Sequence, residues 1–131
     1  MTNGLSHFGF DVDLREGVAS EGSFVYAVTQ PWVELKDERR RAHETGNVFI
    51  EVSQPDRHNP GERKPSGIYA TRADRWGFRL AGDVWLLVPT ERVLAAVETV
   101  VSQHGTVMGG DYNEYEGALV PLRMLVTGAG L

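Results

Sequence analysis

The sequence predicts an α/β domain in which helices flank a mixed central sheet. Two segments, 14–28 and 93–101, repeat apolar residues at the spacing of an amphipathic helix. Short apolar runs with the length and composition of strands lie between them, at 32–36, 47–52 and 84–88. The 131 residues fit one domain, and we expect its core at about 11–103 with 104–131 as a C-terminal extension.

The first expected helix begins at Asp11 and ends before Pro31. Its apolar stripe is formed by Leu14, Val18, Val25 and Val28. Glu21 occupies the same stripe, at a position where an apolar residue is expected. A glutamate there is either a residue at the edge of the stripe or a ligand, and the pattern leaves both interpretations open.

The 32–36 segment is an expected strand that carries two charged side chains. The period of two in a strand places Glu34 and Lys36 on one face and Val33 and Leu35 on the other. A buried carboxylate has to be paired, hydrogen-bonded or bound to a metal. This face of the strand is therefore a candidate site.

The 47–52 segment is the second expected strand, and Glu51 lies in it. Alternation places Glu51 opposite the face that Val48, Ile50 and Val52 share. We expect the polar segment 37–46 to be a connection, and the turn at Gly46-Asn47 to pair the two strands antiparallel. Glu34, Lys36 and Glu51 on neighbouring strands would form either an ion-pair network or a metal site.

Further elements follow from turn residues and apolar spacing. They are a surface loop over 54–65, a strand over 66–70, a helix over 72–80, a central strand over 84–88, a helix ending at 104, and short apolar strands near 106–108 and 118–120. In the 72–80 helix, Ala73, Trp76 and Leu80 would face the core. The uninterrupted apolar run at 84–88 is typical of a strand covered on both faces.

Composition excludes several classes of protein. Hydrophobic residues make up 41% and charged residues 24%, and no apolar run approaches the ~18 residues of a membrane span. Cysteine is absent, so disulfides, thiol catalysis and thiolate zinc sites are excluded. Neither a signal peptide nor a glycine-rich nucleotide-binding motif is present. We expect a cytoplasmic protein.

Positive charge is concentrated in the middle of the chain. Residues 36–79 hold ten of the thirteen Lys and Arg residues and carry a net charge of +3, whereas the rest of the chain carries −8. This asymmetry predicts either a surface that binds a polyanion or a solvated, arginine-rich loop, and charge alone does not separate the two.

In order and spacing, these residues resemble the PD-(D/E)xK nuclease superfamily in a compact bacteriophage version. The matching pieces are Asp13-Leu14, Glu21, Glu34-Leu35-Lys36, Thr45-Gly46-Asn47-Val48-Phe49-Ile50-Glu51, Lys64-Pro65-Ser66-Gly67-Ile68 and Thr71-x-Ala73-Asp74-x-Trp76. They cover about residues 13–88. The resemblance implies a restriction-endonuclease-like core with the order α-β-β-β-α-β.

The resemblance also implies a function, the metal-dependent hydrolysis of phosphodiester bonds in DNA by an endonuclease or exonuclease of phage replication, repair or recombination. The implied catalytic residues are Glu21, Glu34, Lys36 and Glu51. Mg²⁺ or Mn²⁺ would be held by Glu34, Glu51 and the main-chain carbonyl of Leu35. The implied nucleic-acid contacts are Arg39, Arg40, Arg41, Arg57, Arg63 and Lys64. We expect DNA as the partner, no membrane, a homodimer as an open alternative, and the host cytoplasm as the setting if a phage encodes the chain.

The chain departs from the family pattern at one position. The family has an Asp on the strand before Glu-x-Lys, and no Asp lies between Asp13 and Asp37. Either Glu34 takes the Asp position with Glu51 as the second carboxylate, or Glu21 and Glu34 form the pair with Glu51 in support. The departure also leaves a second function open, a catalytically degenerate module that binds nucleic acid or protein.

Overall fold

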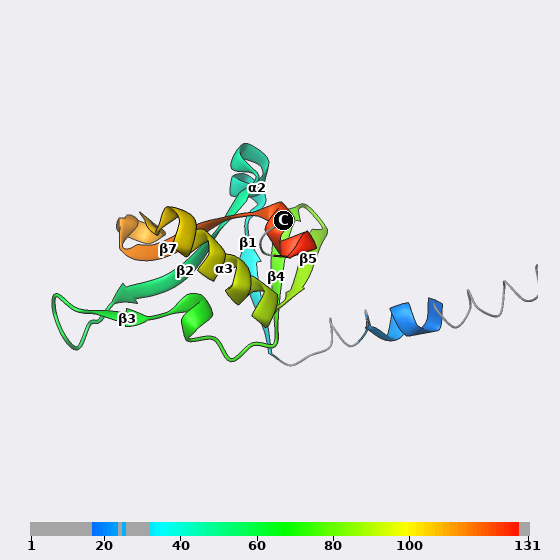
Figure 1. Cartoon of the computed structure of the whole chain (residues 1–131), viewed down its shortest axis with the longest axis horizontal. Coiled ribbons are helices and arrows are strands. Elements are labelled where there is room, and N and C mark those ends of the chain that lie inside the picture. Colours follow the sequence, from blue (N-terminus) through cyan, green and yellow to red (C-terminus); the bar gives the residue numbers. More distant parts are fainter. Residues whose placement is uncertain (1–16, 24, 26–31, 129–131) are drawn as a thin grey trace, which may run out of the picture. The chain divides into compact units, whose positions relative to one another are not determined.

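A computed structural model describes residues 17–23, 25 and 32–128 of the chain (Figure 1). The chain divides into two units, Met1–Pro31 and Trp32–Leu131. In the first unit, residues 17–23 and 25 are helical and exposed, and they fall within the helix expected from Asp11. The other residues of that expected helix lie outside the described ones. No helix among the described residues has the length and apolar composition needed to cross a lipid bilayer.

The second unit confirms the α/β class. Its strands are Val33–Asp37 (β1), Asn47–Pro55 (β2), Arg63–Pro65 (β3), Arg75–Ala81 (β4), Val84–Pro89 (β5), Val107–Gly109 (β6) and Tyr115–Pro121 (β7). Its helices are Arg39–Thr45 (α2), Thr90–His104 (α3) and Leu122–Thr127 (α4), with 3-10 turns at Gly67–Tyr69 (η1) and Asp111–Asn113 (η2). The expected single central sheet is wrong, because the strands form two sheets with the orders β1-β4-β5 and β3-β2-β7-β6.

The hydrophobic core of this unit lies between the two sheets and helices α3 and α4. The buried side chains come from β2 and β7, from β4 and β5, from η1 and from the inner faces of the two helices: Val48, Ile50, Val52, Ile68, Trp76, Phe78, Val88, Val93, Ala96, Val97, Val100, Ala118, Val120, Met124 and Leu125. Helix α3 packs against β7 of one sheet and against β4 and β5 of the other (Figure 1). Burying this apolar surface is the main force that holds the sheets together.

Helix α2 replaces the connection expected at 37–46, and the expected hairpin between 32–36 and 47–52 is wrong. Arg40 pairs with Glu44 at i,i+4, and Arg41 pairs with Glu38 at i,i+3. Such pairs stabilise a short helix by about 0.2–0.5 kcal/mol each. Gly46 ends the helix in the left-handed region at φ 71° and donates its N–H to the carbonyl of Ala42. The helix carries the chain from β1 to β2, in the other sheet.

Strand β4 occupies most of the segment expected to be a helix at 72–80, and that prediction is wrong. Trp76 and Phe78 are buried and Leu80 is partly buried, a period of two, whereas Arg75, Gly77 and Arg79 face the other side. Strand β4 lies at the centre of its sheet, parallel to β1 and antiparallel to β5. The expected core role of Trp76 is confirmed, although in a strand.

The segment expected to be a strand at 66–70 forms the 3-10 turn η1, and that prediction is also wrong. Gly67 has φ +54°, a left-handed conformation that a strand does not contain. The segment 54–65, expected to be a surface loop, is exposed over residues 57–65. It forms a hairpin in which β3 pairs with the end of β2. Asp56 stabilises the turn by accepting hydrogen bonds from the backbone N–H of His58 and the side-chain amide of Asn59.

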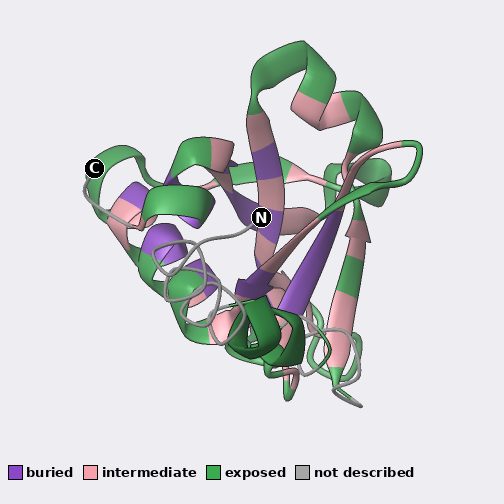
Figure 2. Cartoon of the chain, turned by 90° about the vertical axis from the view of Figure 1, so that its right-hand side faces the viewer, coloured by how far each residue is buried: buried purple, intermediate pink, exposed green. Residues whose placement is uncertain are grey.

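The remaining elements agree with the sequence except for the position of β5. The strand at 84–88 is confirmed, but it lies at the edge of its sheet, with Val84 52% exposed and Val88 buried. Figure 2 shows the buried residues of the second unit within its strands and helices. The helix ending at His104 and the strand near 106–108 are confirmed by α3 and β6. Strand β7 from the C-terminal segment pairs with both β2 and β6 and buries Ala118 and Val120.

Candidate functional site

Strand β1 presents Glu34 and Lys36 on one face, as the alternation predicts. The Lys36 Nζ atom lies 2.9 Å from the Glu34 Oε1 atom. It also lies 5.4 Å from the ring centroid of Trp76, which is fully buried on the neighbouring strand. The lysine ammonium is therefore held between a carboxylate and the face of an indole ring.

Glu51 lies on β2, on the face opposite the buried Val48 and Ile50. Its position is fixed by the turn that follows β3. Ser66 donates its backbone N–H to the Val52 carbonyl at 3.0 Å, and Gly67 lies so close to the Glu51 backbone that an added Cβ would stand 2.7 Å from the Glu51 carbonyl carbon. Only glycine fits this approach, so the turn and the carboxylate are positioned together.

Glu34, Lys36 and Glu51 line one open pocket. The other residues that line it come from β2, from β3 and from the segment around η1: Gln54, Lys64, Pro65, Ser66, Gly67, Ala70 and Thr71. We had expected the three charged residues to meet because their strands were neighbours, and that reason is wrong, because β1 and β2 belong to different sheets. The packing of the two sheets brings them together instead.

The main-chain carbonyl of Leu35, expected as a further metal ligand, belongs to a residue that is not among those lining the pocket. The N–H of Glu38 donates to the carbonyl of Arg79, and the carbonyl of Trp32 accepts from the N–H of Asp74. The even-numbered residues along β1 therefore direct their backbone N–H and C=O groups toward β4. By alternation, the Leu35 carbonyl points away from β4 and is left out of that ladder. The Leu35 side chain, 61% exposed, lies on the opposite face of the sheet from Glu34.

The expected carboxylate Glu21 belongs to the first unit, where it lies in the helical segment 17–23 and is exposed. The described residues that line the pocket above all belong to the second unit. Among the described residues, no group of three or more His, Cys, Asp or Glu side chains could hold a metal ion. The carboxylates among the residues that line the pocket are those of Glu34 and Glu51.

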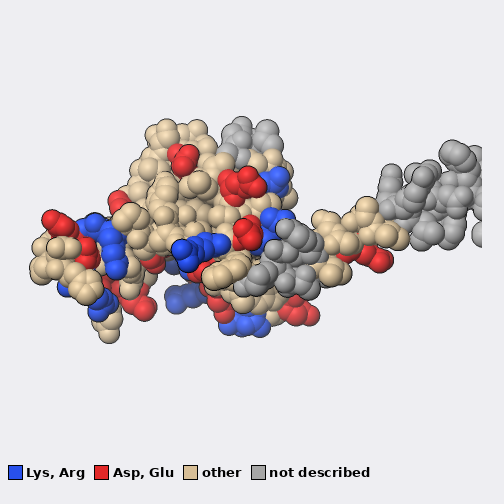
Figure 3. All heavy atoms as spheres, turned by 90° about the horizontal axis from the view of Figure 1, so that it is seen from below, with Lys and Arg blue, Asp and Glu red and all other residues tan. Residues whose placement is uncertain are grey.

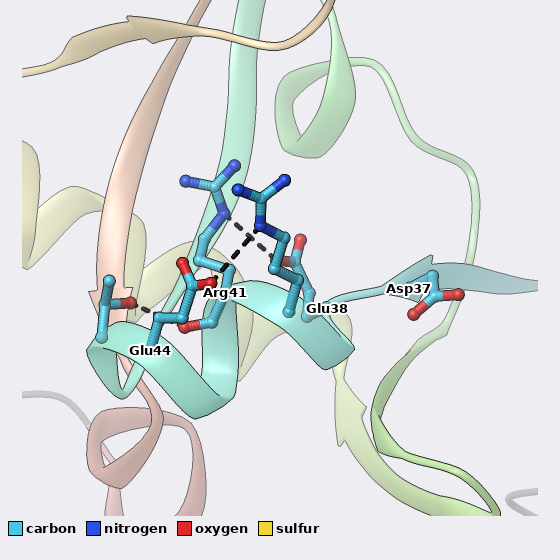
Figure 4. A pocket seen from close by; sticks show the side chains of 6 residues that line it. Asp37, Glu38, Arg41 and Glu44 are labelled. Carbon is cyan, nitrogen blue, oxygen red and sulfur yellow. Dashed lines mark hydrogen bonds and ion pairs between the residues drawn. The ribbon is translucent and has the colours of Figure 1, made fainter.

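The three consecutive arginines lie on or around α2, and each is paired with an acid. Arg39 forms hydrogen bonds with Asp37 at 2.7 and 2.9 Å, and Arg40 and Arg41 form the ion pairs described above. These residues line two other pockets, one of which is shown in Figure 4, and none of them lines the Glu34 pocket. Positive charge in this segment is balanced by Asp37 at the end of β1, Glu38 at the N-cap of α2 and Glu44 in α2, which favours the interpretation of a solvated, arginine-rich segment there.

The two acids beside these arginines have pKa values shifted in opposite directions. The hydrogen bonds from Arg39 lower the pKa of the exposed Asp37 carboxyl. Burial raises the pKa of Glu38. The positive charge of Arg41 and a hydrogen bond from the Phe49 N–H to this carboxylate act in the opposite direction and lower it, but burial is the larger effect. Both shifts belong to the α2 region and not to the Glu34 pocket.

The basic residues of the β2–β3 hairpin have separate roles. Arg63 donates to the Ser53 hydroxyl at 2.8 Å and to the Glu114 carbonyl at 2.9 Å, so it ties the hairpin to the residue immediately before β7. Arg57 is exposed in the turn. Lys64 lines the Glu34 pocket, and it has no ion pair among the described residues. On the face shown in Figure 3, basic and acidic side chains alternate instead of forming a patch of one sign.

Sequence reasoning did not assign Ser66, Thr71 or Gln54 to the site. Ser66 is 5% exposed, and Ser66 Oγ and Trp76 Nε1 are the buried side-chain polar atoms that have no hydrogen-bond partner among the described residues. The glycine after Ser66, in the run Lys64-Pro65-Ser66-Gly67, could have indicated a turn at this point instead of a strand, because glycine readily adopts the left-handed conformation that Gly67 has.

The Glu34 pocket thus has mixed charge. It is lined by the carboxylate residues Glu34 and Glu51, by the two lysines Lys36 and Lys64, and by Ser66, whose hydroxyl has no partner among the described residues. Comparison with models of protein families, with curated proteins and with solved structures finds no match for this chain.

Proposed function

We propose that this chain is a metal-dependent nuclease that hydrolyses phosphodiester bonds in DNA. The observation that carries the proposal is that Glu34, Lys36 and Glu51, from two different sheets, line one pocket together with Lys64. Two carboxylates beside a lysine suit a reaction that develops negative charge on phosphate oxygens.

Mg²⁺ or Mn²⁺ fits the donors that the pocket offers. Glu34 and Glu51 offer carboxylate oxygens there, and the Leu35 carbonyl would be a further ligand from the same strand as Glu34. Mg²⁺ is commonly bound through one or two carboxylates, with water and substrate phosphate completing its shell. A set of two carboxylates is therefore sufficient for this ion. When bound, the metal would stabilise charge on the phosphate and lower the pKa of a water molecule.

Lys36 would provide the fixed positive charge of the site. Glu34 and the Trp76 ring orient the ammonium group, so little reorganisation is needed when charge develops beside it. The Leu35 side chain lies on the other face of β1 and takes no part in positioning the ammonium group.

The finer fold assignment, a restriction-endonuclease-like core, is part of the same proposal. Of its expected order, the strands β1, β2 and β5 are present, most of the first helix lies outside the described residues, and the segments 66–70 and 72–80 differ as described above. A role in phage DNA replication, repair or recombination, and a place in the host cytoplasm, likewise rest on the resemblance.

A second candidate function is a module with the same fold that binds nucleic acid or protein without cutting. Two observations favour it. The Lys36 ammonium is already paired with Glu34 at 2.9 Å, and no third carboxylate or histidine joins the two glutamates among the described residues. A closed ion pair of this kind can persist after catalysis is lost.

Cleavage of labelled DNA separates the two candidates. Duplex, single-stranded, flap and junction substrates are incubated with Mg²⁺ or Mn²⁺, and binding is measured separately in EDTA. We expect cleavage of at least one form, lost in Glu51→Gln, and slowed roughly 100- to 1000-fold in Lys36→Ala, equivalent to about 2.7–4 kcal/mol of transition-state stabilisation.

The matched control is Glu98→Gln, which removes the charge of an exposed glutamate on α3 and should cut at the normal rate. Wild-type protein that binds DNA but cuts no form would favour the binding module. Cleavage that Glu51→Gln and Lys36→Ala leave unchanged would show that this pocket is not the active site.

A further inference from the structure

The Ser66 hydroxyl is a polar group that the folded chain leaves without a partner. The hydroxyl is buried and has no hydrogen-bond acceptor or donor among the described residues, and Ser66 is one of the residues that line the Glu34 pocket. A buried hydroxyl without a partner destabilises a folded protein, whereas alanine at the same position would not. The position therefore suits a hydroxyl group that gains its partner from a ligand.

The backbone around Ser66 is fixed before any ligand arrives. Its N–H donates to Val52 on β2, and its carbonyl accepts from the N–H of Tyr69. The Gly67 carbonyl accepts from the N–H groups of Ala70 and Thr71. The hydroxyl is thus carried on a turn that is hydrogen-bonded both internally and to β2, which lowers the entropy cost of binding.

Two further donors line the pocket beside Ser66. Thr71 Oγ1 accepts from the N–H of Ala73 at 3.1 Å, so its hydroxyl hydrogen is available to another acceptor. Lys64 supplies an ammonium group. Two hydroxyl donors and one cation are the groups with which proteins bind phosphate oxygens.

We propose that Ser66, Thr71 and Lys64 form a binding position for one phosphate group of a nucleic-acid strand, next to the Glu34, Lys36 and Glu51 cluster. The identification of the phosphate as part of a nucleic acid rests on the proposed function. The charges of Glu34 and Glu51 are balanced in the pocket by those of Lys36 and Lys64, so neutral hydroxyl donors can decide whether a phosphate is held there.

The test compares wild type, Ser66→Ala and the control Ser102→Ala, which removes an exposed hydroxyl on α3. Tm is measured with increasing inorganic phosphate against chloride of equal ionic strength. Because phosphate stabilises proteins generally, the informative quantity is the difference between variants. We expect Ser66→Ala to have a Tm equal to or above that of wild type without phosphate, and to gain less from phosphate than wild type or Ser102→Ala.

Binding of a short single-stranded DNA is then measured in EDTA, so that cleavage plays no part. Ser66→Ala should bind roughly tenfold more weakly, the loss expected for one hydrogen bond to a charged oxygen. Lys64→Gln, at an exposed position that does not threaten folding, should also bind more weakly. These results would stand even if the protein cut no DNA, which separates this proposal from the nuclease proposal.

Three results would overturn the inference. A lower Tm for Ser66→Ala without phosphate would show that the hydroxyl has a structural partner. An equal gain from phosphate in wild type and Ser66→Ala would show that the hydroxyl binds no phosphate. A weaker response to phosphate with unchanged DNA binding would assign the position to free phosphate and remove the nucleic acid from the proposal.

Discussion

The contact between Gly67 and the Glu51 backbone predicts that Gly67→Ala is strongly destabilising. An added Cβ would stand 2.7 Å from the Glu51 carbonyl carbon and 2.9 Å from the Glu51 Cβ, with the carbonyl oxygen nearer still. Real Cβ atoms do not approach backbone this closely, so either the turn or β2 has to move. Movement of β2 at this point would displace a carboxylate of the candidate site.

Two costs add in this variant. Alanine in a left-handed conformation, here at φ +54°, costs about 1–2 kcal/mol. Overpacking against fixed backbone costs typically about 1–3 kcal/mol more. We therefore expect Gly67→Ala to lower the free energy of unfolding by roughly 2–5 kcal/mol, a large part of the stability of a small domain.

Chemical denaturation measures this change, and Gly46→Ala is the matched control. Gly46 has φ +71°, yet an added Cβ there meets no atom within 4 Å. Gly46→Ala should thus carry only the backbone cost, and the difference between the two variants isolates the contact with Glu51. If the two variants unfold at the same denaturant concentration with equal slopes, the close approach of the turn to β2 is refuted.

Three further variants test the polar and aromatic contacts of the second unit. Hydrogen bonds from the Thr106 and Ser53 hydroxyl groups lower the pKa of Glu116. The stability that this carboxylate contributes is therefore full above the ordinary pKa of glutamate and is lost as pH falls through the lowered pKa. Glu116→Gln should remove this loss of stability at acid pH, measured by denaturation between about pH 2.5 and 7. Burial raises the pKa of Glu38, so the stability that its protonated form contributes is present at low pH and is lost as pH rises through the raised pKa. If Glu38→Gln leaves the slope of the unfolding free energy against pH unchanged, this expectation is contradicted. Gly117→Ala places a Cβ 2.6 Å from the Cε2 atom of Phe49, with Cζ nearer still, and should lower Tm. The loss should be partly reversed when Phe49→Ala is added, and strictly additive losses would refute the contact.

Local patterns predicted the elements whose burial follows a single period. The alternation in β2 and the 3.6-residue spacing in α3 each agree with the structure, because one face of each element meets the core. The 72–80 segment contained two competing periods. Ala73, Trp76 and Leu80 match a helix, whereas Trp76, Phe78 and Leu80 match a strand, and pairing with β1 and β5 decided for the strand.

The candidate site was predictable only where it is local. The Glu34–Lys36 pair follows from two residues on one face of one strand, and the structure has it at 2.9 Å. The position of Glu51 beside them depends on how two sheets pack, which no spacing along the chain encodes. The pairs of Arg40 and Arg41 follow from charges at i,i+4 and i,i+3, but that spacing has a meaning only in a helix, and the polar composition of 37–46 predicts a connection.

The separation of β1 and β2 into different sheets has a consequence for any attempt to move or mimic the site. The stretch from Trp32 to Val52 contains Glu34, Lys36 and Glu51, but grafting it onto another scaffold would transfer their identities without their arrangement. Strand β1 needs β4 beside it, and β2 needs β7, which ends more than sixty residues further along the chain. The pocket is thus a property of the completed second unit, and it can form only after the last strand has paired.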